Sequence, residues 1–332
     1  MTSKSINTSQ SRLDSMTDKI PLYIDTDPGV DDALAILMAF DSPAHDVVGL
    51  GIAAGNVGLE HTVRNALKLC EIANRDDVPV FPGCHAPLLH AAPDAANVHG
   101  NDGFGDVGHA PAARQADAEH AALALLRLSH EHAGKLLLVA LGPLTNIALA
   151  LKLDPGLPER VGRFVIMGGA VTGHGNITPV AEFNVYFDPE AAHVVFSGFP
   201  RFDLADWEAT MRHGFAHAGI DAWVGAGSEQ ARSPRARFYD AISARTRRWA
   251  AQRRGELWHS ADALAMAWAL APQGATRVEE RPVAVDLAHG AARGLTAVDW
   301  DRRSGAADNA RILLDYDQAA FESRVRAALA AC

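Results

Sequence analysis

Cysteine is scarce in this sequence, which has only Cys70, Cys84 and Cys332 among 332 residues. An odd number of cysteines whose spacing fits no metal-binding knuckle argues against both a disulfide framework and a cysteine zinc site. A chain of this length also needs no covalent cross-links to stabilise its core. We therefore predict a reducing compartment, the cytoplasm.

Basic residues and long apolar runs are lacking too. Lys and Arg number 30 against 40 Asp and Glu, so the net charge is −10, and an acidic chain repels the phosphate backbone of nucleic acids. No stretch approaches the roughly 18 uninterrupted apolar residues of a membrane span, and the N-terminus has no apolar core of a signal peptide. We predict a disordered tail at residues 1–19, a single domain at 20–332, and neither a nucleic-acid nor a membrane partner.

Strand-like and helix-like segments alternate along the rest of the chain, of which 48% is apolar. Strands are expected at 21–24, 47–54, 78–81, 135–141, 163–167 and 202–205, and helices at 30–40, 61–73, 118–132, 144–151 and 189–197. This alternation predicts an α/β fold of the Rossmann-like kind, an open and mostly parallel sheet flanked by helices. The later part is less regular: we expect an Arg-rich helical segment at 219–255, strands at 283–287 and 310–314, and a closing helix at 319–331.

The sharpest local feature is the segment from Asp25 to Asp32, which places four carboxylates within eight residues at a strand-to-helix turn. Two like charges about 4 Å apart repel by about 4 kcal/mol at an effective dielectric constant of about 20, and a helix N-terminus offsets only about 0.3–1 kcal/mol. A hard divalent cation would compensate the rest. The alternative, in which Asp31 and Asp32 only cap a helix, explains two of the four. An EF-hand is excluded because Val30 stands where that loop needs glycine.

Several segments, taken in order, resemble the inosine–uridine-preferring nucleoside hydrolases. The resemblance covers the chain from about residue 20 to its end and is weakest at 206–260. It rests on the acidic segment at 25–33, Gly55-Asn56, the loop at 97–103, the run at 141–146, the glycines at 168–169, Gly175-Asn176 and the stretch at 181–192.

The resemblance implies a calcium ion, a catalytic base and a set of ribose ligands. Calcium would be bound by Asp27, Asp32, the Leu141 carbonyl and Asp262. Asp27 would also act as general base on the metal-bound water, as N-glycosidic cleavage through an oxocarbenium-like state requires. Ribose would be held by Asp31, Asn56, Asn184, Asn176, Glu182 and Met167. Some of these have structural alternatives, since Asn176 after Gly175 is also a typical turn residue.

The chain departs from the family pattern on the side of the nucleobase. Family members often carry a His and a Pro around the last motif Asp, where this chain has Ala261 and Ala263. Because that His is thought to protonate the leaving base, its absence leaves His259 or His99 as alternative acids. Stacking of the base on Trp249 or Trp258 is a further alternative, against the simpler interpretation that both tryptophans pack between helices.

The resulting hypothesis is an N-glycosidase that converts a small-molecule ribonucleoside to free base and ribose in purine or pyrimidine salvage. A non-catalytic nucleoside or ribose sensor on the same fold, and a hydrolase of an unusual riboside, remain alternatives. A haloacid-dehalogenase-like phosphatase is disfavoured because Pro28 and Gly29 interrupt its motif. The resemblance also implies a homodimer or homotetramer, while the preferred base stays open.

Overall fold

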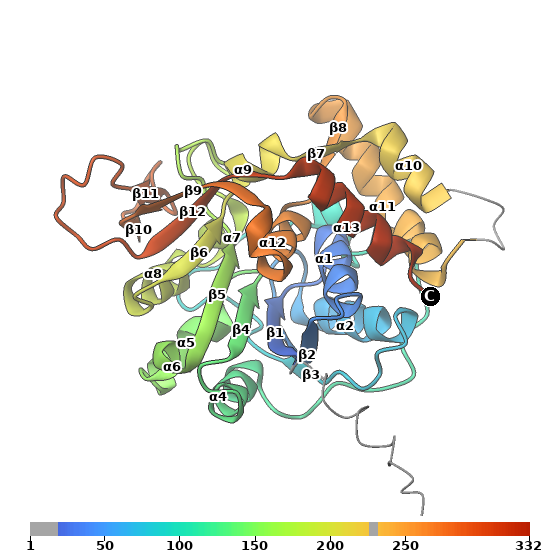
Figure 1. Ribbon diagram of the computed structural model, residues 1–332, viewed down its shortest axis with the longest axis horizontal. Helices are drawn as coiled ribbons and strands as arrows, with labels where there is room; N and C mark the ends of the chain where they lie inside the picture. The colour runs from blue at the N-terminus through green and yellow to red at the C-terminus, as the bar shows by residue number, and fades with distance from the viewer. Residues whose placement is uncertain (1–18, 226–231) are drawn as a thin grey trace, which may run out of the picture.

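An eight-stranded sheet runs through the middle of the molecule, in the order β3-β2-β1-β4-β5-β6-β12-β9 (Figure 1). The computed structural model describes residues 19–225 and 232–332, so the predicted tail at 1–19 lies outside the described residues except for Lys19. The strands of this sheet are β1 (Ile20–Thr26), β2 (His45–Ile52), β3 (Val80–Pro82), β4 (Leu136–Ala140), β5 (Val161–Met167), β6 (Phe202–Ala205), β9 (Ala275–Arg281) and β12 (Ala310–Tyr316). Neighbouring strands pair in parallel, except that β9 is antiparallel to β12. The predicted α/β fold is confirmed.

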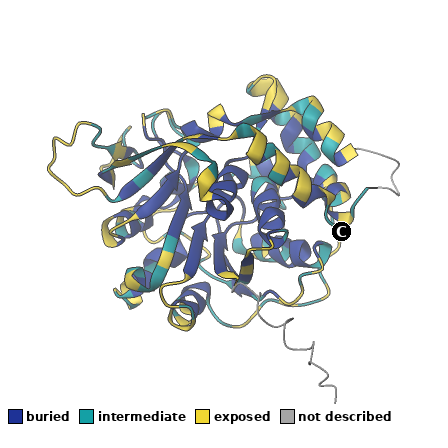
Figure 2. Cartoon of the chain, in the orientation of Figure 1, coloured by how far each residue is buried: buried dark blue, intermediate teal, exposed yellow. Residues whose placement is uncertain are grey.

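Helices cover both faces of the sheet and form two apolar cores with it (Figures 1 and 2). One face carries α1 (Val30–Phe40), α2 (Leu59–Ile72), α11 (Pro234–Arg253), α12 (Ala261–Leu270) and α13 (Gln318–Ala330). The other carries α4 (Ala121–Glu131), α5 (Thr145–Leu153) and α8 (Pro189–Gly198). The shorter elements are α3 (Ala96–His99), α6 (Leu157–Arg160), α7 (Phe183–Phe187), α9 (Trp207–Arg212), α10 (His217–Gly225) and a 3-10 turn, η2 (Pro272–Gly274).

The apolar pattern of the central elements explains their place. All five residues of β4 are buried, as expected for a strand covered on both faces, which reads as a continuous apolar run rather than an alternating one. Helix α1 is apolar nearly all round, and only Asp31 among its residues is not fully buried. A helix of this kind belongs in the core, and α1 indeed packs against α12, α13 and α11.

The irregular later part was predicted less well. The segment expected to be helical at 219–255 contains α10 and α11, and its residues 226–231 lie outside the described residues. The strand predicted at 283–287 is the short β10 (Val283–Val285), which pairs with β11 (Thr296–Val298) away from the main sheet. Sequence patterning also missed the antiparallel pair of β7 (Gly214–Ala216) and β8 (Leu257–His259), which α10 and α11 separate in the chain, because three-residue strands carry no periodicity.

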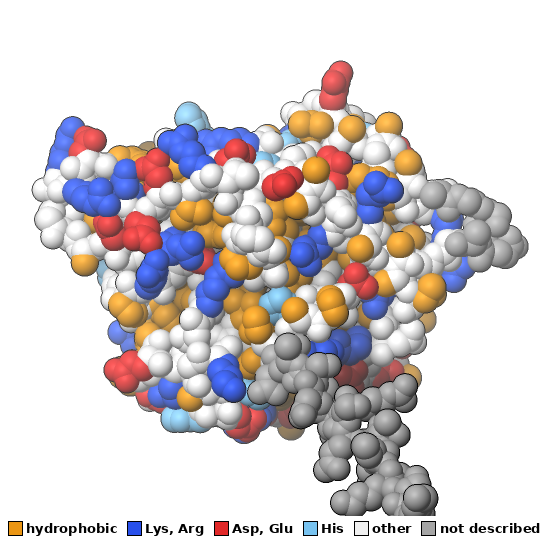
Figure 3. All heavy atoms as spheres, viewed as in Figure 1, with side chains coloured by type: hydrophobic (Ala, Val, Ile, Leu, Met, Phe, Trp, Pro, Cys, Tyr) orange, Lys and Arg blue, Asp and Glu red, His pale blue; other side chains and the backbone are white. Residues whose placement is uncertain are grey.

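On the face drawn in Figure 3, acidic and basic side chains lie intermixed rather than gathered into one basic area, unlike the clustered Lys and Arg of nucleic-acid binders. Within residues 19–225 and 232–332, no helix combines the length and apolarity needed to cross a bilayer.

Candidate active site

The carboxyl ends of the central strands converge on one pocket. Asn56 lies a few residues beyond β2, Leu141 follows β4 directly, and Met167 ends β5; all three line the pocket. Parallel strands place their carboxyl ends at one edge of the sheet, where open α/β folds bind ligands. Polar residues that are far apart in the sequence therefore meet here.

Asp27, the first polar residue beyond β1, is held in one orientation next to the pocket. Its side chain is 1% exposed, and its Oδ2 accepts a 2.7 Å hydrogen bond from the backbone N–H of Asn56. Its Oδ1 is buried without a hydrogen-bond partner in the described structure. Gly55 and Gly142 leave room for this carboxylate, because a Cβ at either position would overlap its oxygens. One oxygen is thus fixed while the other remains free to accept a proton.

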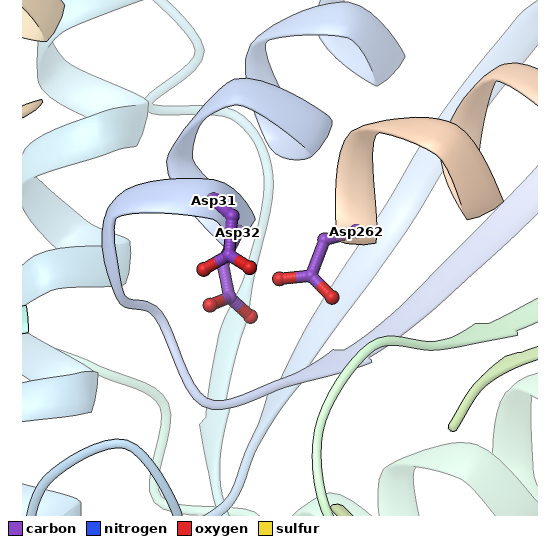
Figure 4. Close-up of side chains that lie close together, drawn as sticks. All are labelled: Asp31, Asp32 and Asp262. Carbon is purple, nitrogen blue, oxygen red and sulfur yellow. The ribbon is translucent and has the colours of Figure 1, made fainter. Parts of the chain in front are cut away.

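Three further carboxylates form a cluster (Figure 4), and those of Asp31 and Asp32 lie near enough to Asp27 to raise its pKa. Asp31 and Asp32 lie in the first turn of α1, and Asp262 lies in the first turn of α12. One oxygen of each lies within 4.8 Å of the others, and Figure 4 shows the three carboxylates turned toward one another. The two helix N-termini direct their positive dipole ends at this cluster. The sequence predicted Asp32 and Asp262 as metal ligands but assigned Asp31 to ribose.

The electrostatics of the cluster call for a cation. Burial, and then the neighbouring carboxylates, raise the pKa of Asp27 and of Asp262 well above the usual range. Burial raises the pKa of Asp31 to about 6, and burial followed by Asp31 raises that of Asp32. Like charges held this close in a buried site favour protonation or the binding of a cation. The donor set, carboxylate and carbonyl oxygens, suits a hard divalent metal.

Amide side chains brace the acidic segment from both sides. The Asn56 Nδ2 donates to the Asp27 carbonyl at 3.1 Å and to Asp32 Oδ2 at 3.0 Å. On the far side, the Asn146 Nδ2 donates to Asp25 Oδ2 at 3.1 Å. Burial raises the pKa of Asp25 to about 8, while the Asn146 hydrogen bond opposes that rise. Asp25 therefore bonds to the structural amide of Asn146 and lies outside the carboxylate cluster.

The predicted ribose ligands Met167, Asn176, Glu182 and Asn184 all line the same pocket. Asn184 Nδ2 donates to the Leu141 carbonyl at 2.7 Å, which ties β4 to α7. Glu182 caps α7 and accepts hydrogen bonds from the backbone N–H groups of residues 169, 184 and 185. Burial nevertheless raises its pKa to about 7. The exposed Asn176 accepts from the backbone N–H of Phe183 at 2.8 Å, so it is both a turn residue and a pocket residue.

His99 enters the pocket from α3 as a neutral imidazole. Its Nδ1 accepts a 3.1 Å hydrogen bond from the backbone N–H of Val30, which assigns the ring proton to Nε2. Burial lowers the pKa of His99 to about 4. At neutral pH this ring has an Nε2–H that can donate a hydrogen bond to a ligand, but it carries no acidic imidazolium proton.

The three predicted residues on the base side, His259, Trp249 and Trp258, also line the pocket. Trp258 is 2% exposed and its ring packs against Phe215 and Tyr239, so most of it belongs to the core. Trp249 is only partly buried. Burial, and then Arg254, lower the pKa of His259. These residues come from α11 and β8, the part of the chain with the weakest resemblance.

Several residues that line the pocket were not predicted from the sequence, and Trp207 and Arg254 are two of them. Trp207 begins α9 two residues beyond the end of β6, so its place at the carboxyl edge of the sheet was a usable signal. Arg254 follows α11 directly, and nothing in its local sequence distinguishes it from the neighbouring arginines at 247, 248 and 253.

The sequence profile described as inosine-uridine preferring nucleoside hydrolase matches residues 22–323. The chain belongs to this family. Uridine nucleosidase 1 from Arabidopsis thaliana is 49% identical over 177 residues, which is 53% of this chain and 53% of that protein. The pyrimidine-specific ribonucleoside hydrolase RihA from Klebsiella pneumoniae is 37% identical over 91% of this chain and 96% of its own length. Thus the match spans about half of the plant relative and nearly all of the bacterial one.

The fold of this nucleoside hydrolase family member also resembles solved structures. The plant nucleoside hydrolase PpNRh1 superposes with a TM-score of 0.87 at 30% identity, covering 94% of this chain and 99% of that one. The family predicted from the ordered motifs is confirmed.

Proposed function

We propose that this nucleoside hydrolase family member cleaves the N-glycosidic bond of ribonucleosides, giving free base and ribose. The observation that carries the proposal is Asp27, with one oxygen fixed by Asn56 and the other buried and unpartnered beside a carboxylate cluster. This is the arrangement of a general base beside a metal, the chemistry that hydrolysis through an oxocarbenium-like state needs. A non-catalytic sensor would need the carboxylate cluster, but it would not need an unpartnered Oδ1 on a carboxylate that Asn56 holds in place.

For the metal we propose calcium, held by Asp27, Asp32, the Leu141 carbonyl and Asp262. The burial of Asp27 and the short distances among Asp31, Asp32 and Asp262 support a cation at this place. The Leu141 carbonyl accepts one hydrogen bond from Asn184, and its second lone pair is left for a ligand. When bound, the ion would lower the pKa of a water molecule and attract the vicinal hydroxyls of ribose.

We assign proton transfer and sugar binding to individual side chains. Asp27 takes the proton of the attacking water at Oδ1, and Asp31 holds ribose hydroxyls. The Asn56 Nδ2 already donates to two protein acceptors. The side-chain oxygen Oδ1 of Asn56 is therefore the atom that can accept a hydrogen bond from a sugar hydroxyl. We assign Glu182, Asn176 and Met167 to the side of the sugar that carries the 5′-hydroxyl, and Asn184 to the ribose hydroxyls with Asp31. Together these groups orient ribose over Asp27.

The departing base receives no conventional acid in this arrangement. Ala261 and Ala263 occupy the positions of the expected His and Pro. His99 and His259 line the pocket, but burial lowers the pKa of each, so at neutral pH neither supplies an imidazolium proton. Trp249 is the more accessible of the two candidate stacking rings. We therefore favour base departure without a histidine acid.

The cellular setting follows from the family and the cysteines. We propose a cytoplasmic enzyme of purine or pyrimidine salvage, consistent with the three free cysteines, of which Cys70 is buried. By the same resemblance we propose a homodimer or homotetramer, which light scattering of the purified protein would measure.

The test is release of free ribose by the calcium-loaded protein from uridine, cytidine, inosine, adenosine and p-nitrophenyl riboside. We expect hydrolysis of at least one natural ribonucleoside and of the nitrophenyl substrate, with 2′-deoxyuridine as a matched control that is cleaved much more slowly. Hydrolysis of the nitrophenyl substrate alone would point to an unusual riboside with a good leaving group. If calcium binds and none of these ribosides is cleaved, the hydrolase proposal fails and the sensor takes its place.

A further inference from the structure

Arg254 lies in the part of the pocket lined by Trp207 and Trp249, which we call the base end. It follows the last turn of α11, with its backbone N–H bonded to the Ala250 carbonyl at 2.7 Å. Gly255 then adopts a positive φ of 85°, which ends the helix as a left-handed residue after the cap commonly does. This termination leaves the Arg254 side chain in the pocket, whereas the preceding Arg253 is exposed and does not line it.

Two indole rings hold the Arg254 guanidinium. Its Cζ lies 4.6 Å from the ring centroid of Trp207 and 5.0 Å from that of Trp249. Both distances are within the range of cation–π attraction. Across the described residues, the Arg254 side chain makes no hydrogen bond and no ion pair. Its five N–H donors are thus oriented by ring contacts and left available.

The pocket is electrically polarised along its length. Asp31, Asp32 and Asp262 gather at the sugar end, while Arg254 is the only Lys or Arg among the described residues that line the pocket. Burial lowers the pKa of Arg254 and Asp31 opposes this, but an arginine remains protonated at neutral pH. A cation without an ion pair in a partly buried site is costly unless it gains a partner, and a ligand bound in the pocket can supply one.

We propose that Arg254 stabilises the negative charge that develops on the nucleobase as the glycosidic bond breaks. The inference rests on the proposed hydrolase function and assigns the leaving-group role that the missing histidine leaves open. The water oxygen bonds to C1′ and its proton passes to Asp27. The electron pair of the C1′–N bond departs with the base, which Arg254 meets with N–H donors. The departed base then takes a proton from solvent, and Asp27 returns its own.

The charge pattern of the pocket matches that of this transition state. Positive charge grows on the sugar near the carboxylates, and negative charge grows on the base near Arg254. Preorganised donors aimed at developing charge cost no reorganisation during the reaction. A neutral His99 or His259 supplies less of this stabilisation than a permanent cation, because hydrogen bonds from charged donors are about twice as strong.

The test compares R254M with R253M on two substrates of the calcium-loaded protein. Arg253 is the matched control, because its Cζ also lies over the Trp249 ring, at 5.2 Å, but outside the pocket. Removal of one preorganised donor typically lowers kcat about 100- to 1000-fold, so we expect R254M to lower kcat/KM for uridine about 100-fold. For p-nitrophenyl riboside, whose leaving group needs little stabilisation, we expect a loss of less than about threefold by the same argument. R253M should match the unmodified protein on both.

A second measurement separates a charge effect from a packing effect. Methylguanidinium added to R254A should restore part of its uridine hydrolysis, and circular dichroism should show R254A and R254M folded. Equal losses on both substrates, or no loss on uridine, would overturn the role of Arg254 while leaving the hydrolase proposal standing. Failure of the unmodified protein on every riboside would instead overturn the proposed function itself.

Discussion

The sugar end and the base end of the pocket are built in different ways. At the sugar end, side chains extend from strand ends and helix N-termini, and hydrogen bonds to the backbone fix them, as the Asn56 N–H fixes Asp27. At the base end, Trp249 and Arg254 come from the end of α11 and are held by ring contacts. Hydrogen bonds impose a direction, whereas ring contacts tolerate shifts. If the proposed function is correct, the fold fixes ribose recognition and leaves base recognition adjustable.

The largest expected effect is at the fixed end. Asp27→Asn keeps an oxygen that can accept from the Asn56 N–H but loses the basic Oδ1. General-base catalysis contributes about 10²–10⁴-fold, so we expect kcat to fall about 1000-fold with little change in stability. Asp46→Asn, at an exposed position of β2, is the control. Steady-state kinetics on uridine would contradict the assignment if kcat stayed within tenfold.

The next largest effect is expected for Asn146, whose hydrogen bonds support the sugar end of the pocket. Asn146 is fully buried; its Oδ1 accepts from the Cys84 N–H and its Nδ2 donates to Asp25 and to the Ile52 carbonyl. Each buried group left unsatisfied costs about 1–3 kcal/mol, so Asn146→Ala should lower the free energy of unfolding by about 2–4 kcal/mol. Denaturant titration measures this. Asn101→Ala, at an exposed site, should cost less than about 0.5 kcal/mol; equal losses would remove the special role of Asn146.

The same contrast explains which parts of the structure could be predicted from the sequence. The sheet, α1 and the acidic segment follow from local signals, since a buried apolar strand, a Pro-Gly turn and clustered carboxylates are all contiguous in the chain. The strand-end rule then brings Asn56, Leu141 and Met167 together. No comparable rule predicts which residues form the base end of the pocket. Trp258 turned out to be mainly a core residue, and Arg254 enters the pocket through the helix termination at Gly255, which depends on where α11 packs.

The position of Asp31 shows a finer limit. The resemblance implied a ribose ligand, a role we retain as a proposal, and its carboxylate also lies within 4.8 Å of those of Asp32 and Asp262, which the sequence did not predict. Spacing in sequence indicates that residues share a turn, but it does not give the distance to a helix more than 200 residues later. That distance depends on the packing of α12 against α1, a tertiary contact that no local pattern encodes.

A smaller effect, on substrate binding, is expected at the base end. Stacking of a base on an aromatic ring is worth about 1–3 kcal/mol, so Trp249→Ala should raise KM for uridine about tenfold. Inhibition by free ribose, which reports the sugar end alone, should change less than about twofold because it involves no base stacking. Competition kinetics measures both constants. A parallel loss of ribose binding would show that the two ends are coupled and would break the distinction drawn between them.

The smallest effect concerns Glu182, which joins the sugar end to α7. Burial raises its pKa from the ordinary 4.5 to about 7, so the folded protein binds more protons than the unfolded chain between these pH values. This group therefore contributes most stability below its unfolded pKa, and that contribution is lost as pH rises through about 7. The slope is at most about 1.4 kcal/mol per pH unit.

Glu182→Gln removes this titration, so the stability of the variant should fall less steeply than that of the unmodified protein between pH 4.5 and pH 7. Denaturant melts in the presence of a chelator measure the difference without a contribution from metal binding. Glu60→Gln, at an exposed position, controls for the loss of one carboxylate. Parallel curves for Glu182→Gln and the unmodified protein would mean that the three backbone N–H donors fully offset the burial of Glu182, and that the sugar end is held by a permanently ionised carboxylate.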